Sequence, residues 1–185
     1  SNSMAESLAK ALGGQFSMFH APAMVSRIQA KTELMQEQSI ASILEAASHV
    51  DVALSGIGAP EESSTIIQTG YFSKEMIEDF SKYEICGDIC LNFYDKNGNL
   101  SAYEHNQRVI GINIEILRRV PWSFGVAGGV HKANAIRGAL IGKYINVLVT
   151  DCECAELLLQ LLVCTGAPDS GCAGFYCLYA AFYQE

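Results

Sequence analysis

The chain has 185 residues, with 12 Lys and Arg against 20 Asp and Glu, and a formal net charge of -8. This length is typical of one domain, and the acidic balance argues against direct binding to nucleic acid or to an anionic membrane. Half of the residues are apolar and 17% are charged, which excludes a disordered chain. No apolar run reaches the roughly 18 residues of a membrane span, and no signal peptide is recognisable. We therefore expect a cytoplasmic protein without a membrane partner.

The cysteines favour buried, reduced thiols. There are seven, an odd number, and thiols stay reduced in the cytoplasm. The close pairs are Cys86 with Cys90 and Cys152 with Cys154, spaced C-x-x-x-C and C-x-C, whereas a zinc site favours paired C-x-x-C spacings. We therefore expect these thiols to act as small apolar side chains, and we predict neither a metal site nor a cofactor.

Apolar periodicity and the punctuation by Gly and Pro predict alternating helices and strands. In chain order we expect a helix over 5–12, a strand over 15–20, a helix over 33–49, a strand over 50–55, a helix over 74–83, a strand over 85–94 with a hairpin partner over 100–103, a short helix over 113–119, a strand over 122–127, a helix over 132–140, a strand over 145–150 and a helix over 154–163. This order predicts an α/β fold, Rossmann-like and layered, with a mostly parallel sheet covered on both faces.

In open α/β sheets, ligands bind beyond the carboxyl ends of the strands. Gly56 and Gly58 follow the strand predicted over 50–55 and could bring backbone amides close to an anion, although an ordinary tight turn explains them equally well. Asp88 lies within the apolar run ICGDIC and needs a hydrogen-bond partner there. A sugar hydroxyl would serve, as would a neighbouring backbone amide.

The third strand end is AGGVHKA, where Gly128 and Gly129 turn the chain into a helix, and we expect both glycines to bind the ligand. Helix N-termini attract anions, so a cation in this first turn is disfavoured unless an anion lies nearby. The position of Lys132 therefore predicts a bound phosphate. The alternative is that its ammonium group points into solvent. Lys132 could also form a Schiff base, but nothing in the sequence shows a desolvated amine. Arg108 could reach a carboxylate or a phosphate, but we expect it to be an exposed rim residue. We expect Asp151 to cap the helix that follows it.

Four ordered motifs carry a family resemblance: VALSGIGAP, GDICLNFYDKNG, RVIGINIEILRRVPWSFGVAGGVHKANAIRGALIG and INVLVTD. They resemble the sugar-binding effector domain of the SorC family of bacterial transcription regulators. The family's fold is similar to that of sugar-phosphate isomerases, glucosamine-6-phosphate deaminases and CoA transferases. The resemblance implies that Gly56 and Gly58 line the ligand, that Asp88 binds sugar hydroxyls, and that Lys132 contacts the ligand near its phosphate.

The sequence departs from the family pattern at both ends. Family members begin with a helix-turn-helix DNA-binding domain and a first strand with a Gly/Thr-rich loop, and neither is found in this sequence. We therefore expect an effector domain over 5–160 that lacks part of the phosphate cradle, with an exposed strand edge or apolar face that favours homo-oligomers. Residues 161–185 do not fit the family's ending, and we expect them to form a packed aromatic segment.

Three functions follow from these observations. The first is a binding module that senses a phosphorylated sugar or related metabolite and contacts DNA only through a domain absent from this chain. The alternative is a sugar-phosphate isomerase or deaminase, with Asp88 as general base. That enzyme would need a second acid, a His or a nucleophile beside Asp88, which the sequence does not place there, so we expect no catalytic residues. The third is an oligomerisation domain that has lost its ligand.

Overall fold

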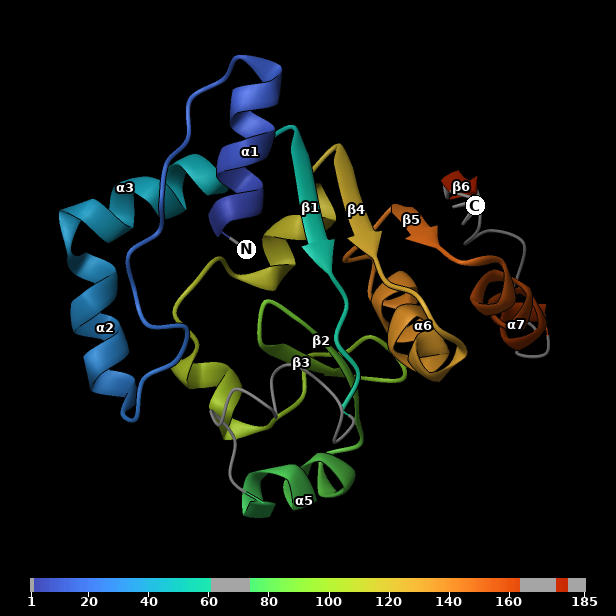
Figure 1. Cartoon of the computed structure of the whole chain (residues 1–185). Helices are drawn as coiled ribbons and strands as arrows, with labels where there is room; N and C mark the ends of the chain where they lie inside the picture. Colours follow the sequence, from blue (N-terminus) through green and yellow to red (C-terminus); the bar gives the residue numbers. More distant parts are fainter. Residues whose placement is uncertain (1, 61–73, 164–175, 180–185) are drawn as a thin grey trace.

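A computed structural model describes residues 2–60, 74–163 and 176–179 of the chain (Figure 1). Its main sheet has four strands in the order β1-β4-β5-β6, all paired in parallel. They are β1 (Val52–Gly56), β4 (Trp122–Val126), β5 (Val147–Thr150) and β6 (Tyr176–Tyr179). The predicted α/β class with a mainly parallel sheet is confirmed, and the strands predicted over 50–55, 122–127 and 145–150 are all present.

The sheet packs on a core built around helix α6 (Ala133–Ile141) and helix α7 (Cys152–Val163). Ala135, Ile136 and Ala139 of α6 lie in this core, and so does the thiol of Cys154 in α7. The strands approach the core closely at Gly125 of β4, where a Cβ would lie 2.7 Å from Cδ1 of Ile145. The expectation of buried thiols thus holds for Cys154, but Cys90 and Cys152 are exposed.

The opposite face of the sheet is open in the described part of the chain. Val52 and Leu54 of β1 are 56% and 65% exposed, and Trp122 and Val126 of β4 are 47% and 42% exposed. These side chains share one face, because Val52 pairs with Trp122 and Gly56 with Val126 in register. The prediction of a sheet covered on both faces is therefore wrong for this face within the residues described.

A separate antiparallel hairpin corrects the single strand predicted over 85–94. It consists of β2 (Ile85–Ile89) and β3 (Asn92–Asp95), joined through Cys90 and Leu91 at positive φ. The predicted partner strand over 100–103 is reduced to one bridge, between Tyr94 and Leu100. Helix α5 (Lys74–Lys82) covers the hairpin through a second cluster, in which Ile85 packs with the aromatic residues Phe80, Phe93 and Tyr103.

Three described helices precede β1: α1 (Asn2–Leu12), α2 (Ile28–Gln36) and α3 (Gln38–Ala47). The single helix predicted over 33–49 is interrupted because Glu37 has an extended backbone, with φ -60° and ψ 126°. No strand forms over 15–20. The sheet-like pairing falls a few residues later, where the amide of Val25 donates to the carbonyl of Arg108 at 3.0 Å.

Three 3-10 segments complete the described chain: η1 (Glu104–Arg108), η2 (Ile114–Arg119) and η3 (Val130–Lys132). The short helix predicted over 113–119 corresponds to η2, and the helix predicted to begin at Lys132 begins as η3 and continues as α6. Of the atypical tail predicted over 161–185, residues 164–175 and 180–185 lie outside the described residues. None of the helices in the described ranges combines the length and the apolar character that crossing a bilayer requires.

Candidate functional site

The loop that leaves β1 joins the parallel sheet to the hairpin. Ile57 is buried and its amide donates to the carbonyl of Val126 at 3.3 Å, while Gly58 exchanges two backbone hydrogen bonds with Asp88, at 3.0 and 3.1 Å. Gly58 lies directly under the Asp88 carboxylate, and a Cβ at this position would overlap Oδ1. Gly58 is therefore required by a close approach, and it brings the exit of β1 next to Asp88.

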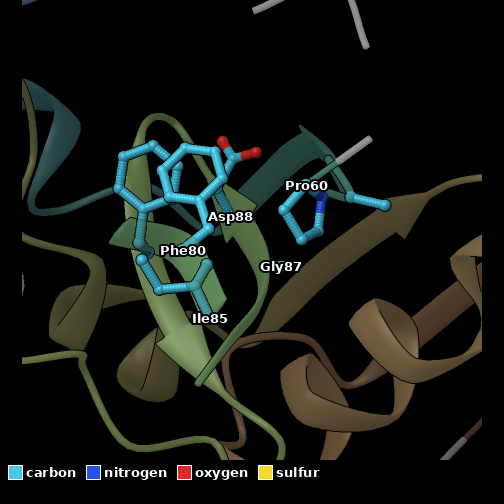
Figure 2. A pocket seen from close by; sticks show the side chains of 7 residues that line it. Pro60, Phe80, Ile85, Gly87 and Asp88 are labelled. Atoms are coloured by element: carbon cyan, nitrogen blue, oxygen red, sulfur yellow. The ribbon is translucent and has the colours of Figure 1, made fainter. Parts of the chain in front are cut away.

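Asp88 is a buried carboxylate, 6% exposed. Its Oδ2 accepts the amide N–H of Leu91 at 3.1 Å, from the turn of the hairpin. Burial raises the pKa of Asp88 to about 6, against the opposing effects of the Leu91 amide and the charge of Lys132. Figure 2 shows Asp88 with Pro60 and Phe80 around a small hollow, whose volume of about 10 Å³ is enough for about one water molecule.

Lys132, the last residue of η3 after the end of β4, reaches the same loop. Its ammonium nitrogen Nζ donates to the carbonyl oxygen of Ile57 at 3.1 Å. The side chain thus ends one residue from Gly58, and its positive charge favours the ionised form of Asp88. Two of the predicted strand ends and the hairpin therefore meet at residues 56–58, where a carboxylate and an ammonium lie close together.

At the Gly128-Gly129 turn, the carboxylate of Asp151 binds the amide of Gly129. Gly129 has φ +95° and donates its amide N–H to Oδ2 of Asp151 in a short hydrogen bond. A Cβ at Gly128 would lie 2.9 Å from the same oxygen. Oδ1 of Asp151 accepts the amide of Cys154 at 2.8 Å, which confirms the predicted cap of α7. The sequence did not predict the hydrogen bond between Asp151 and Gly129. The signal that could have indicated it is the position of Asp151 at the end of a strand, next to the neighbouring strand end.

Arg108 lies elsewhere. Its guanidinium donates to the carbonyl of Ser26 and to Glu104, both at 3.2 Å, and so fastens η1 to the segment before α2. The side chain is 20% exposed, so the expectation of an exposed rim residue is wrong. Among the described side chains, no group of three His, Cys, Asp or Glu is arranged to hold a metal ion.

Comparison with known proteins places this arrangement in a family. The family model described as "Putative sugar-binding domain" matches residues 1–160. The sorbitol operon regulator of Klebsiella pneumoniae is 37% identical over 139 residues, covering 75% of this chain and 44% of that protein. The deoxyribonucleoside regulator of Bacillus subtilis is 33% identical over the same length and with the same coverage.

Solved structures indicate the same family as the sequence comparisons. The sugar-binding domain of a transcriptional repressor from Vibrio fischeri superimposes with a TM-score of 0.79 at 33% identity, over 86% of this chain and 64% of that one. The full-length sorbitol operon regulator SorC from Klebsiella pneumoniae gives 0.78 at 34% identity, over 85% and 51%.

The fold and the matches define a sugar-binding domain of the kind found in bacterial transcriptional regulators. The chain belongs to the SorC-type sugar-binding domain family. It spans less than half the length of the curated relatives just described. Those relatives are named as regulators, which supports a regulatory domain over the isomerase or deaminase alternative.

Proposed function

We propose that this domain binds a phosphorylated sugar, or a related metabolite, beyond the carboxyl ends of β1 and β4. The observation that carries the proposal is the convergence of Asp88 and Lys132 on the glycine loop, with the Lys132 ammonium 3.1 Å from the Ile57 carbonyl. A buried carboxylate that accepts one backbone amide retains lone pairs for sugar hydroxyls. An ammonium beside it supplies the charge that a phosphate needs.

The glycines divide their work in this proposal. Gly56 and Gly58 allow the backbone to approach the ligand, and Gly56 and Gly128 are exposed on their strand ends. The amide of Gly129 is already bound to Asp151, so Gly129 shapes the turn. The anion then depends on Lys132 and on the remaining backbone amides at the site.

In the whole protein, we propose that the ligand acts by population shift. A ligand that binds one arrangement of subunits more tightly favours that arrangement, and a DNA-binding domain outside this chain reads it. Such a regulator works in the cytoplasm, where its operator lies. The chain's own net charge of -8 makes a direct DNA contact by this domain unfavourable.

We also propose that the domain assembles into homo-oligomers. The support is the open face of the sheet, where four large apolar side chains are 42–65% exposed in the described chain. Parallel sheets are normally covered on both faces, and β1 ends the sheet with an unpaired edge among the described strands. Both features favour association with a further layer.

A thermal-shift screen against phosphorylated sugars tests the ligand proposal. A ligand at 100 times its Kd adds about 2.7 kcal/mol to the free energy of unfolding, which raises the melting temperature measurably. Lys132→Ala should abolish the thermal shift. The control is Lys96→Ala, which changes an exposed lysine in the turn after β3 and should retain the shift. An unchanged response of Lys132→Ala would remove Lys132 from the site. Steady turnover of a sugar phosphate, followed by NMR, would contradict a pure binding role.

A further inference from the structure

Asp151 links three elements at the edge of the proposed ligand site. It follows Thr150, the last residue of β5, and precedes α7. One carboxylate oxygen accepts the amide of Cys154 at 2.8 Å and the other accepts the amide of Gly129. Neighbouring strand ends make this possible, since the amide of Ala127 donates to the carbonyl of Val149 at 3.1 Å. Asp151 thus ties the end of β4 to the start of α7.

The position of Gly129 affects the position of Lys132 through the backbone. Gly129 is held at φ +95°, and its carbonyl accepts the amide of Lys132 at 3.0 Å. That bond closes the first turn of η3 and fixes where the Lys132 side chain starts. From there Nζ reaches the carbonyl of Ile57 at 3.1 Å. A change at Gly129 therefore moves the base of the Lys132 side chain relative to the β1 loop.

The carboxylate is suited to this role because it is charged. The amides of Cys154 and Gly129 lower the pKa of Asp151, so it is ionised at neutral pH. Hydrogen bonds between an ionised acceptor and a backbone amide are shorter and stronger than neutral ones. Its charge also keeps a second anion off the Gly129 amide. In the proposed function, this leaves Lys132 as the group of the turn that binds the phosphate.

We propose that Asp151 is a positioning residue for the effector site: its carboxylate holds the Gly128-Gly129 turn so that Lys132 faces the Ile57-Gly58 loop, and it does not itself contact the ligand. This inference rests on the proposed function. The competing explanation is a purely structural one, in which Asp151 serves only as the N-cap of α7.

Asp151→Ser separates the two roles. Serine is as good an N-cap as aspartate, so it keeps the bond to the Cys154 amide, but its single oxygen cannot also reach Gly129. Asp151→Ala loses both bonds. In the full chain, we expect Asp151→Ser to melt close to wild type and Asp151→Ala to melt at a lower temperature. Both variants should bind the sugar phosphate that gives the largest thermal shift with wild type about tenfold more weakly.

A second measurement works without any ligand. Amide hydrogen exchange at Gly129 and Lys132 should accelerate at least tenfold in Asp151→Ser. The amide of Tyr144, which donates to the Ala139 carbonyl at 3.0 Å, should not change and serves as the control. Wild-type affinity in Asp151→Ser, or unchanged exchange at Gly129 and Lys132, would overturn the proposal. Wild-type protein that binds no sugar phosphate would instead contradict the proposed function, and the exchange rates would then decide the role of Asp151 alone.

Discussion

Replacing Asp88 by asparagine should stabilise the domain, and by more as the pH rises from 4 to above 6. Burial raises the pKa of Asp88 from its ordinary 3.8 to about 6, so the folded chain keeps a proton that the unfolded chain has released. The contribution of protonated Asp88 to the free energy of unfolding is therefore fully present below pH 3.8, and it is lost as the pH rises through about 6. At about 1.4 kcal/mol for each pH unit between these values, ionised Asp88 costs about 3 kcal/mol at pH 7.5.

Asparagine removes this cost and keeps the main contact. It has the shape of the protonated acid, and its oxygen can accept the Leu91 amide that now lies 3.1 Å from Oδ2. Urea unfolding at pH 4.5, 5.5, 6.5 and 7.5 gives the free energy of unfolding for both proteins. The gain in stability of Asp88→Asn over wild type should be about 1 kcal/mol at pH 4.5 and should grow to as much as about 3 kcal/mol at pH 7.5.

Asp95→Asn is a control of opposite sign. Burial acts to raise the pKa of Asp95, but hydrogen bonds from Asn99 and Asn97 outweigh it and lower the pKa. Its contribution to stability is therefore present at neutral pH and lost as the pH falls, so Asp95→Asn should be less stable than wild type at pH 7.5. A pH-independent difference for Asp88→Asn would refute the reasoning, because it would show that the carboxylate is not desolvated in the folded chain.

Two further predictions concern close packing and assembly. Gly58→Ala places a methyl group on Oδ1 of Asp88 and should destabilise the fold by about 1–3 kcal/mol. In the Asp88→Gly background the same Gly58→Ala change should cost much less in urea unfolding, and an equal cost in both backgrounds would show that the two positions are not in contact. Leu54→Lys changes a side chain of the open face and should reduce the molar mass measured by light scattering. The control is Leu159→Lys on α7, which should leave the molar mass unchanged. The two leucines are similarly exposed, 65% for Leu54 and 60% for Leu159. Equal masses for both variants would exclude the open face as the interface.

The elements that could be predicted are those whose ends are marked in the sequence. The helix over 132–140 was predicted because Gly128 and Gly129 precede it and Gly142 ends it, and the structure places α6 within a residue of these bounds. The strands that became β1, β4 and β5 have apolar runs bounded by Gly, Pro or Asp. In these segments the local sequence and the tertiary contacts favour the same structure.

The hairpin of β2 and β3 could not be predicted, because its turn lacks the residues that usually form one. Cys90 and Leu91 adopt φ of +51° and +63°, a region that favours Gly and Asn. The apolar run ICGDICLNFY therefore has the pattern of one long strand. Tertiary packing imposes the turn instead: Asn92, which is buried, donates to the carbonyls of Ile89 and Cys90 at 3.2 and 3.1 Å and ties the two ends of the turn together.

The same turn explains how the candidate site forms. The rule that ligands lie at the carboxyl ends of parallel strands led to Asp88, yet Asp88 lies in an antiparallel hairpin and not in the main sheet. It reaches the end of β1 because Gly58 pairs with it as a short antiparallel bridge, which extends the β1 exit onto the edge of the hairpin. The Gly58 bridge and the Lys132 contact with Ile57 then hold the hairpin, β1 and η3 together at one point. A ligand that touches both Asp88 and Lys132 would therefore bind across the junction of two separate sheets, where its binding energy can act on their relative arrangement.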